Sequence, residues 1–268
     1  LLAGLWAEGE TAVTEPEPTR DHTERMLRAF GYEVKTEANR ISLQGGGKLV
    51  GTDIQVPSDI SSAAFFMVGA AITENADITL EAVGVNPTRT GIIEILKQMG
   101  ADIAVENERI AGGEPIADIR IRGTRTLKGI HIPEDQVPLA IDEFPALFIA
   151  AACAEGRTIL TGAAELRVKE SDRIQVMADG LQTMGIDCTP TEDGIIIEGK
   201  GKSGEWSAIF EGGEIESHHD HRIAMSFSIA GLRNSGVIKI VGTETVATSF
   251  PTFTQLTAQA GLTIDVTE

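Results

Sequence analysis

Residues 167–185 read Arg-Val-Lys-Glu-Ser-Asp-Arg-Ile-Gln-Val-Met-Ala-Asp-Gly-Leu-Gln-Thr-Met-Gly. Apolar residues recur there at helical spacing and a glycine follows, which predicts an amphipathic helix that ends at Gly185. Lys169 and Arg173 then lie at or just before its first turn, against the positive end of the helix dipole. Such a cation is unfavourable unless a negative charge lies beside it. Either Glu170 and Asp172 or a bound anion can supply that charge.

Arginines also stand at the start of three other expected helices. Arg20 opens a helix that ends at Gly31, and Arg89 opens one that ends at Gly100. Arg222 begins a helix that is apolar almost all round and is therefore expected to be buried. Because the same placement recurs, we favour anion binding over simple salt-bridged helix starts.

The sequence repeats one pattern four times: an Ala-rich helix, a Thr/Ile/Val strand, a capped helix that ends in glycine, and another strand. The expected helices are 1–7, 19–30, 61–72, 88–99, 145–154, 170–184, 221–232 and 249–260. The expected strands are 11–14, 32–36, 77–81, 101–105, 158–161, 186–189, 237–241 and 262–266. Residues 41–49 and 194–199 are expected to be hairpin strands with glycine turns. The spacing is too long for a solenoid and predicts supersecondary units of a globular α/β (α+β) fold.

Composition excludes several functional classes. The net charge of −18, from 40 acidic and 22 basic residues, argues against nucleic-acid binding. We find no apolar run long enough to cross a membrane and no secretory leader, so we expect a cytoplasmic protein. Cys153 and Cys188 are expected to be reduced core thiols. The cluster of His218, His219 and His221 lacks metal-ligand spacing, so no metal and no cofactor are expected. The chain opens on an apolar helical pattern without a cap, which suggests a piece of a longer protein.

Three cations and two carboxylates gather at the starts of these helices. They are Asp142, Lys169, Glu170, Arg173 and Arg222. This combination suits binding a multiply charged anion and moving a proton beside it. No nucleophile elbow is present and neither cysteine has a histidine partner in sequence, so covalent catalysis is not expected.

Six ordered motifs resemble the enolpyruvylshikimate-phosphate synthase (3-phosphoshikimate 1-carboxyvinyltransferase) family, in the bacterial branch with glyphosate-tolerant members. They are residues 19–24, 58–63, 86–91, 167–173, 220–227 and 247–251, and the resemblance covers essentially the whole chain. It implies an inside-out α/β barrel of βαβαββ units in two domains, with about four of the six units present. Residues 1–57 would be the last unit of the inserted domain, and residues 58–268 the second domain. Motifs of the family that bind both substrates are absent from this sequence.

The resemblance also implies roles for single residues. Lys169, Arg173 and Arg222 would bind the phosphate and carboxylate of phosphoenolpyruvate. Arg20 would contact the phosphate of shikimate 3-phosphate and Asp142 its ring hydroxyls. Asp142 and Glu170, beside Lys169, are the acid–base candidates for transfer of the enolpyruvyl group with release of phosphate. These two small molecules are the expected partners, and a monomer is expected.

Two alternatives stay open. One is the related enolpyruvyl transferase that acts on UDP-N-acetylglucosamine. The other is a non-catalytic fragment that binds anions weakly. We expect the second behaviour from the chain as it stands, because much of the family's substrate-binding machinery is not in this sequence.

Overall fold

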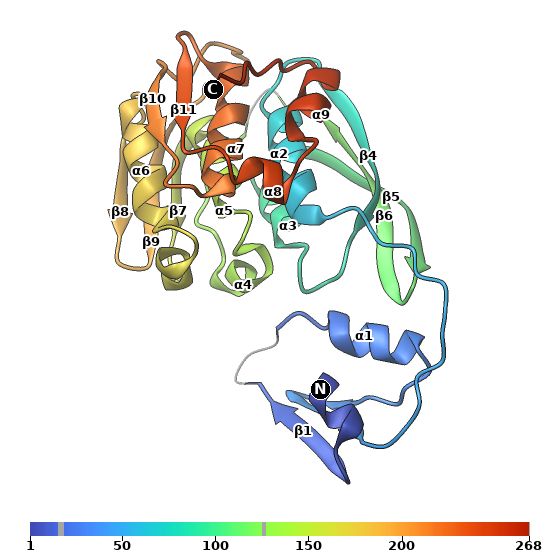
Figure 1. The fold of residues 1–268 in the computed structure, drawn as a ribbon. Coiled ribbons are helices and arrows are strands. Elements are labelled where there is room, and N and C mark those ends of the chain that lie inside the picture. Colours follow the sequence, from blue (N-terminus) through green and yellow to red (C-terminus); the bar gives the residue numbers. More distant parts are fainter. Residues whose placement is uncertain (16–18, 125–126, 268) are drawn as a thin grey trace.

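Two separate hydrophobic cores organise the chain in a computed structural model that describes residues 1–15, 19–124 and 127–267. The smaller core consists of Leu5, Leu27, Tyr32, Val34, Ile41 and Leu43. The larger one extends from Ile60 to Phe253. Figure 1 shows the segment around the small core, in blue, set apart from the rest of the molecule. We refer to residues 1–57 as the N-terminal unit and to residues 58–267 as the main body.

The N-terminal unit contains one three-stranded sheet and one helix. Its elements are a 3-10 helix η1 (Leu2–Trp6), β1 (Glu10–Thr14), α1 (His22–Ala29), β2 (Lys35–Glu37) and β3 (Arg40–Gln44). The antiparallel sheet has the order β1-β3-β2. The α-helix expected at residues 1–7 is a 3-10 helix instead.

The glycine-rich stretch after β3 is not the hairpin turn that the sequence suggested for residues 41–49. The strand ends at Gln44, and the chain after Gly46 has no regular structure as far as Pro57. Gly45 lies so close to η1 that a Cβ atom there would stand 2.0 Å from the Ala7 carbonyl oxygen. Glycine at this position therefore allows one backbone segment to pack closely on another, and it does not form a hairpin turn.

The main body begins with two units that follow the same plan. The first contains α2 (Ile60–Ala71), β4 (Asp77–Gly84), α3 (Gly91–Gln98), β5 (Asp102–Ala111) and β6 (Glu114–Arg122). The second contains η2 (Glu134–Gln136), α4 (Val137–Ala140), α5 (Phe144–Ala152), β7 (Glu155–Leu160), η3 (Ala164–Val168), α6 (Arg173–Thr183), β8 (Cys188–Thr191) and β9 (Gly194–Lys200). Their sheets have the orders β4-β6-β5 and β7-β9-β8.

The last unit contains β10 (Gly213–Glu216), α7 (His221–Ala230), η4 (Gly231–Arg233), β11 (Ile238–Val241), α8 (Val246–Ser249) and α9 (Phe253–Gln259). β10 and β11 pair in parallel. Two expectations are wrong here. The helix expected at 249–260 begins only at Phe253, as α9, and the preceding helix α8 ends at Ser249, because Pro251 between them lacks a backbone donor. Residues 262–266 form no strand, since they have no strand partner among the described residues.

The topology confirms the predicted repeat for three of its four copies. In all three three-stranded sheets the third strand in sequence lies between the first and second. Isolated parallel bridges join Ser58 to Val83 and His131 to Ile159, so the segment before each inner helix runs beside the strand after it, as β10 does with β11. The closing glycines at 31, 100, 185 and 261 all have positive φ.

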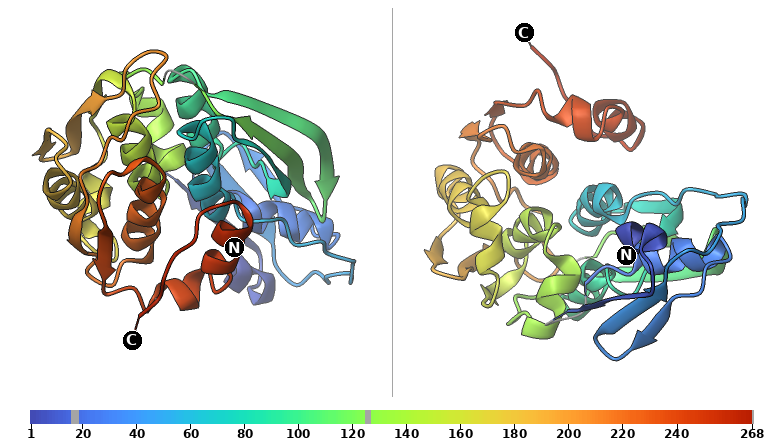
Figure 2. Two further views of the ribbon diagram at one scale, coloured as in Figure 1. Left: turned by 90° about the horizontal axis from the view of Figure 1, so that it is seen from above. Right: turned by 60° about the horizontal axis from the view of Figure 1, so that its bottom comes forward.

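Helices α2, α5 and α7 lie inside the main body and the sheets lie outside (Figures 1 and 2). Each inner helix is apolar on nearly all sides, and all nine residues of α5 are buried. This is the inside-out α/β arrangement expected from the sequence, although the sheets do not close into a barrel. Among the described residues no helix is long and apolar enough to cross a membrane.

Candidate functional site

The amino ends of the three inner helices meet at one buried carboxylate, Glu143. The Ser61 hydroxyl, in the first turn of α2, donates a hydrogen bond to Glu143 Oε1. Arg222, in the first turn of α7, lies 3.8 Å from the same oxygen, and Arg89, just before α3, lies 3.9 Å from it. Burial raises the pKa of Glu143, although the Ser61 hydrogen bond and the two arginines oppose that shift. Glu143 thus ties the helix starts to one another at one end of the main body.

Asp142, one residue earlier, is the centre of the predicted cluster. Its carboxylate accepts a hydrogen bond from Arg20 Nη2 at 2.5 Å, and Lys169 Nζ and Arg173 Nη1 each lie 3.5 Å from Oδ1. Its backbone carbonyl accepts a hydrogen bond from Arg222 Nη1 at 3.0 Å. The structure therefore brings four separated basic residues to one aspartate.

The charge around Asp142 controls its protonation. Burial alone would raise the pKa of this carboxyl. The hydrogen bond from Arg20 and the positive charges of Arg222 and Lys169 outweigh burial and lower the pKa from 3.8 to about 2. Asp142 is thus an anion at neutral pH, and Arg20 is the partner that keeps its pKa low by hydrogen bonding.

Arg173 is the most enclosed of these cations. Its side chain is 1% exposed. Nε donates to Asp220 Oδ2 at 2.9 Å, and Nη2 donates to Glu170 Oε2 at 2.5 Å. Asp220 in turn caps α7 through the Arg222 backbone N–H and accepts from the Ser171 hydroxyl. The helix start on α6 is therefore salt-bridged, as one of the two sequence interpretations held.

Lys169 and Glu170 precede α6 and are more open to solvent. The Lys169 side chain is 20% exposed and also pairs with Glu165, while the Glu170 side chain is 53% exposed. Asp172 takes the N-cap position of α6 and accepts from the Gln175 backbone N–H at 3.0 Å. Because Asp172 serves the helix, Glu170 is the carboxylate that faces the cluster.

Sequence reasoning missed the buried part of this site. It singled out neither Glu143 nor Asp220, and it gave Arg89 no partner. Arg89 donates to the Ser61 hydroxyl at 2.6 Å and lies 3.4 Å from Asp59 Oδ1. The available signal was an acidic pair, residues 142–143, directly before a wholly apolar helix, since a carboxylate in that place is buried and needs partners.

Other nucleophilic and metal-binding chemistry has little support. Cys153 and Cys188 are free and buried as predicted, and burial raises the pKa of Cys153 to about 12 and that of Cys188 to about 11. His219 pairs with Glu244 at 2.6 Å. Within the part of the chain that the structure describes, no three metal-binding side chains gather at one place.

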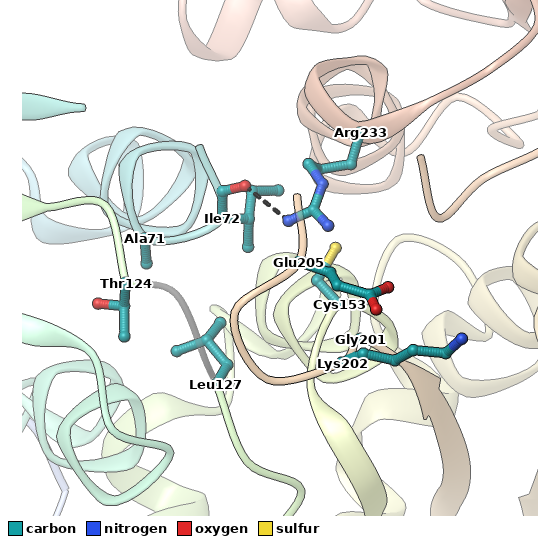
Figure 3. A pocket seen from close by; sticks show the side chains of 9 residues that line it. All are labelled: Ala71, Ile72, Thr124, Leu127, Cys153, Gly201, Lys202, Glu205 and Arg233. Atoms are coloured by element: carbon teal, nitrogen blue, oxygen red, sulfur yellow. Dashed lines mark hydrogen bonds between the residues drawn. The ribbon is translucent and has the colours of Figure 1, made fainter. Parts of the chain in front are cut away.

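A small cavity at the carboxyl end of α5, away from Glu143, is not a substrate site. It is lined in part by Cys153, Lys202 and Arg233 and holds about 10 Å³, which is room for about one water molecule (Figure 3). Arg233 Nη1 donates to the Ile72 carbonyl at the end of α2, and its other nitrogens donate to the Ser207 carbonyl. Arg233 therefore serves the end of a helix, where a cation is favourable.

Comparison with known proteins agrees with this geometry. The family model of EPSP synthase (3-phosphoshikimate 1-carboxyvinyltransferase) matches residues 1–256. A protein of that name from Methylococcus capsulatus is 63% identical over 266 residues, covering 99% of this chain and 59% of the relative. One from Nitrosococcus oceani is 62% identical over 264 residues, covering 98% of this chain and 57% of the relative.

Solved structures give the same result. EPSP synthase from Acinetobacter baumannii is 86% identical with a TM-score of 0.98, and the match covers 100% of this chain and 60% of that one. The enolpyruvyl transferase NikO from Streptomyces tendae, at 17% identity and a TM-score of 0.75, shares the fold over 97% of this chain and 57% of its own length. The chain thus spans about three fifths of the length of the relatives it matches. It belongs to the EPSP synthase (3-phosphoshikimate 1-carboxyvinyltransferase) family.

Proposed function

We propose that this chain forms part of an enzyme that transfers the enolpyruvyl group of phosphoenolpyruvate to the 5-hydroxyl of shikimate 3-phosphate and releases phosphate. The observation that carries the proposal is the convergence of Arg20, Lys169, Arg173 and Arg222 on Asp142. A protein of net charge −18 that gathers four cations at one carboxylate is built to bind a small, dense anion there. Family membership supports the identity of the two substrates.

Different cations would bind each of the two substrates. Lys169 and Arg222 would hold the phosphate and carboxylate of phosphoenolpyruvate, together with Arg173. Since Arg173 is nearly buried, its part is limited to the Nη2 edge that now contacts Glu170. A ligand oxygen would replace the Glu170 carboxylate there. Arg20 would bind the 3-phosphate of shikimate 3-phosphate, and Asp142 would accept hydrogen bonds from the ring hydroxyls.

The reaction needs three proton transfers. The 5-hydroxyl oxygen forms a bond to C2 of phosphoenolpyruvate, its proton passes to a base, and C3 takes up a proton. The tetrahedral intermediate then breaks the C2–O bond to phosphate, and C3 returns one proton to restore the double bond. Asp142 and Glu170 are the two carboxylates available at the cluster for these transfers, and Lys169 Nζ lies 3.5 Å from Asp142 Oδ1.

Arg20 links substrate binding to the pKa of Asp142. Its hydrogen bond is the interaction that does most to lower the pKa of Asp142. When Arg20 turns to the substrate phosphate, Asp142 loses that bond, and its pKa rises. Binding of shikimate 3-phosphate would thereby make Asp142 a better proton acceptor at the moment that a hydroxyl is placed beside it.

We assign residues 1–57 to the last unit of the family's inserted domain and residues 58–268 to its second domain, with the substrates bound between the two domains. Arg20 comes from the first and the other cluster residues from the second. A monomer in the cytoplasm remains the expectation from the sequence.

Phosphate release tests the proposal. It is measured with phosphoenolpyruvate and shikimate 3-phosphate for the 268-residue chain alone, and for the chain mixed with the part of the Methylococcus capsulatus relative that it does not cover. We expect release from the mixture and little from the chain alone. Lys169→Met should slow the mixture by about 100-fold or more. Lys200→Met is the control, because Lys200 pairs with Glu211 on an exposed surface.

The outcomes separate the alternatives. Equal rates for the two lysine variants would contradict the assigned site. Release with UDP-N-acetylglucosamine in place of shikimate 3-phosphate would favour the related transferase, which the comparisons do not favour. A folded mixture that releases no phosphate would leave only an anion-binding role.

A further inference from the structure

Asn86 lies where the N-terminal unit meets the main body, and neither the predicted site nor the proposed reaction uses it. It belongs to the motif of residues 86–91 and follows β4. Its side chain is buried, at 2% exposure for the residue. The side-chain carbonyl accepts two hydrogen bonds from Thr88, one from the backbone N–H at 2.9 Å and one from the hydroxyl at 2.8 Å. These bonds fix the amide so that its NH₂ group points out of its own loop.

That NH₂ group connects two carboxylates that belong to different units. It donates to Asp21 Oδ1 at 2.6 Å, in the N-terminal unit, and to Glu114 Oε2 at 3.1 Å, at the start of β6. An arginine and a histidine complete the network. Arg25 Nε lies 2.8 Å from both oxygens of Asp21, and His22 Nδ1 lies 2.7 Å from Glu114 Oε1.

The network holds the first turn of α1 from both sides. Asp21 is the N-cap residue of α1, and Arg25 and His22 lie in its first turns. The turn between β5 and β6 also presses against this helix, since a Cβ on Gly113 would stand 3.1 Å from the Arg25 carbonyl oxygen and 3.3 Å from the Ala29 Cβ. Burial alone would raise the pKa of Asp21, but hydrogen bonds from Arg25 and Asn86 lower it, so Asp21 is an anion at neutral pH.

Arg20 immediately precedes Asp21 and is the N-terminal unit's contribution to the Asp142 cluster. We propose that Asn86 is a positioning residue: by joining Asp21 to Glu114 it fixes the start of α1 on the main body and so places Arg20 over Asp142. The inference rests on the proposed role of Arg20 in binding the substrate phosphate. It explains why an amide, rather than a carboxylate or a methyl group, stands at position 86.

An exchange of the amide for a carboxylate tests this directly. Asn86→Asp keeps the shape of the side chain but turns the donor toward Asp21 and Glu114 into a third negative charge. Asn107→Asp is the matched control, because Asn107 Nδ2 also donates to a carboxylate, Asp118 Oδ2 at 2.8 Å, but within the β5–β6 hairpin. Asp21→Asn changes the acceptor of the same hydrogen bond. This variant replaces Asn86→Asp in the experiment if Asn86→Asp does not fold.

Two readouts are needed. The first is the distance distribution between spin labels on Lys35→Cys, in β2, and Lys239→Cys, in β11, both at exposed positions. We expect a shifted or broadened distribution in Asn86→Asp and Asp21→Asn and none in Asn107→Asp. The second is a calorimetric titration with shikimate 3-phosphate. Asn86→Asp should weaken binding by about tenfold or more, as the loss of a charge-assisted hydrogen bond implies.

A double variant shows whether Asn86 acts through Arg20. In an Arg20→Ala background, Asn86→Asp should weaken binding of shikimate 3-phosphate by less than about twofold further, because two residues that act as one unit are not additive. Full additivity, or distance distributions that match the wild type, would overturn the positioning role. If the wild-type chain does not bind shikimate 3-phosphate even when mixed with the part of the relative that it does not cover, the proposed function is overturned instead, and the distance measurement still tests the role of Asn86.

Discussion

Arg173 and Arg157 each pair with a carboxylate, but they differ in burial. Arg173 is 1% exposed and its partner Asp220 is fully buried, whereas Arg157 and Glu198 are both exposed. Removing one partner of a buried pair leaves the other charge without compensation. We therefore predict that Arg173→Ala lowers the free energy of unfolding by about 3–5 kcal/mol. Arg157→Ala should cause a far smaller loss in the same urea titration.

A similar loss of stability in both variants would contradict this account of Arg173. The prediction also affects how activity data are interpreted. Lost turnover in Arg173→Ala would reflect unfolding as well as lost substrate contact, so Lys169 is the better residue for testing catalysis. Lys169 is partly exposed and contacts only the carboxylates of Glu165 and Asp142 in the ion pairs that the structure describes.

The pKa of Asp142 predicts a dependence of stability on acid. Since the folded state lowers this pKa from 3.8 to about 2, the ionised form stabilises the fold above pH 3.8. That contribution to the free energy of unfolding, roughly 2 kcal/mol, is lost as the pH falls from about 4 to about 2. Asp142→Asn should therefore flatten the stability profile between pH 4 and 2, measured by chemical denaturation at each pH. An unchanged slope would mean that other carboxyls control the acid response.

The sequence predicted which charged residues converge but not how each is buried. The recurrence of arginine at helix starts singled out Arg20, Arg89, Arg173 and Arg222 alike, although only the family resemblance gave Arg20 a role at the site. It could not show that Arg173 lies against Asp220 or that Glu143 joins three helices, because both facts depend on the order in which the inner helices pack. A local sequence pattern shows which residues share one face of a helix. It does not show which residues of other helices contact that face.

At the scale of elements, the close packing of α6 against α7 depends on a glycine at their contact. Gly180, in the middle of α6, faces the ring of Phe227 on α7, and a Cβ there would stand 2.2 Å from the ring. Gly180→Ala would gain about 1 kcal/mol of helix propensity but force the helices apart, which costs about 1–3 kcal/mol. Since Arg173 and Asp220 stand at the starts of these two helices, we predict a net loss of stability and weaker anion binding.

Gly231→Ala provides the control for that experiment. Gly231 has helical φ, and a Cβ there would meet only Leu262 Cδ1, at an ordinary 3.9 Å. The midpoint of thermal unfolding of Gly231→Ala should equal that of the wild type or be slightly higher. A Gly180→Ala protein as stable as Gly231→Ala would show that α6 and α7 tolerate separation.

Elements with strong periodic signals were predictable and those that depend on a partner were not. The inner helices and most strands of the three three-stranded sheets lie close to their predicted ranges, because burial on every side or alternation marks them locally. One hairpin differs: β5 continues to Ala111, beyond the expected 101–105, and no strand was predicted where β6 lies. Residues 262–266 have the composition of a strand, yet a strand exists only through hydrogen bonds to a neighbour. The same limit applies to residues 45–49, whose glycines serve contacts with η1 and Tyr32.

At the scale of the whole molecule, the two cores differ greatly in size. The N-terminal core contains six buried residues, which is little apolar surface to offset the entropy of ordering its chain. We predict that the N-terminal unit opens before the main body. In native-state hydrogen exchange, the amides of β3 should exchange faster than those of α5. Uniform protection would contradict the division into two cores.

The Arg20–Asp142 contact joins these two parts at one site, where we propose that enolpyruvyl transfer takes place. Addition followed by elimination at phosphoenolpyruvate requires that C3 gain a proton from the medium and later return one of three. The most direct test is the reaction in D₂O, using this chain mixed with the part of its relative that it does not cover, with the product weighed by mass spectrometry. We predict an enolpyruvyl ether in which most molecules carry deuterium on the vinyl carbon. Product without deuterium, or a folded mixture that forms no product, would contradict the account.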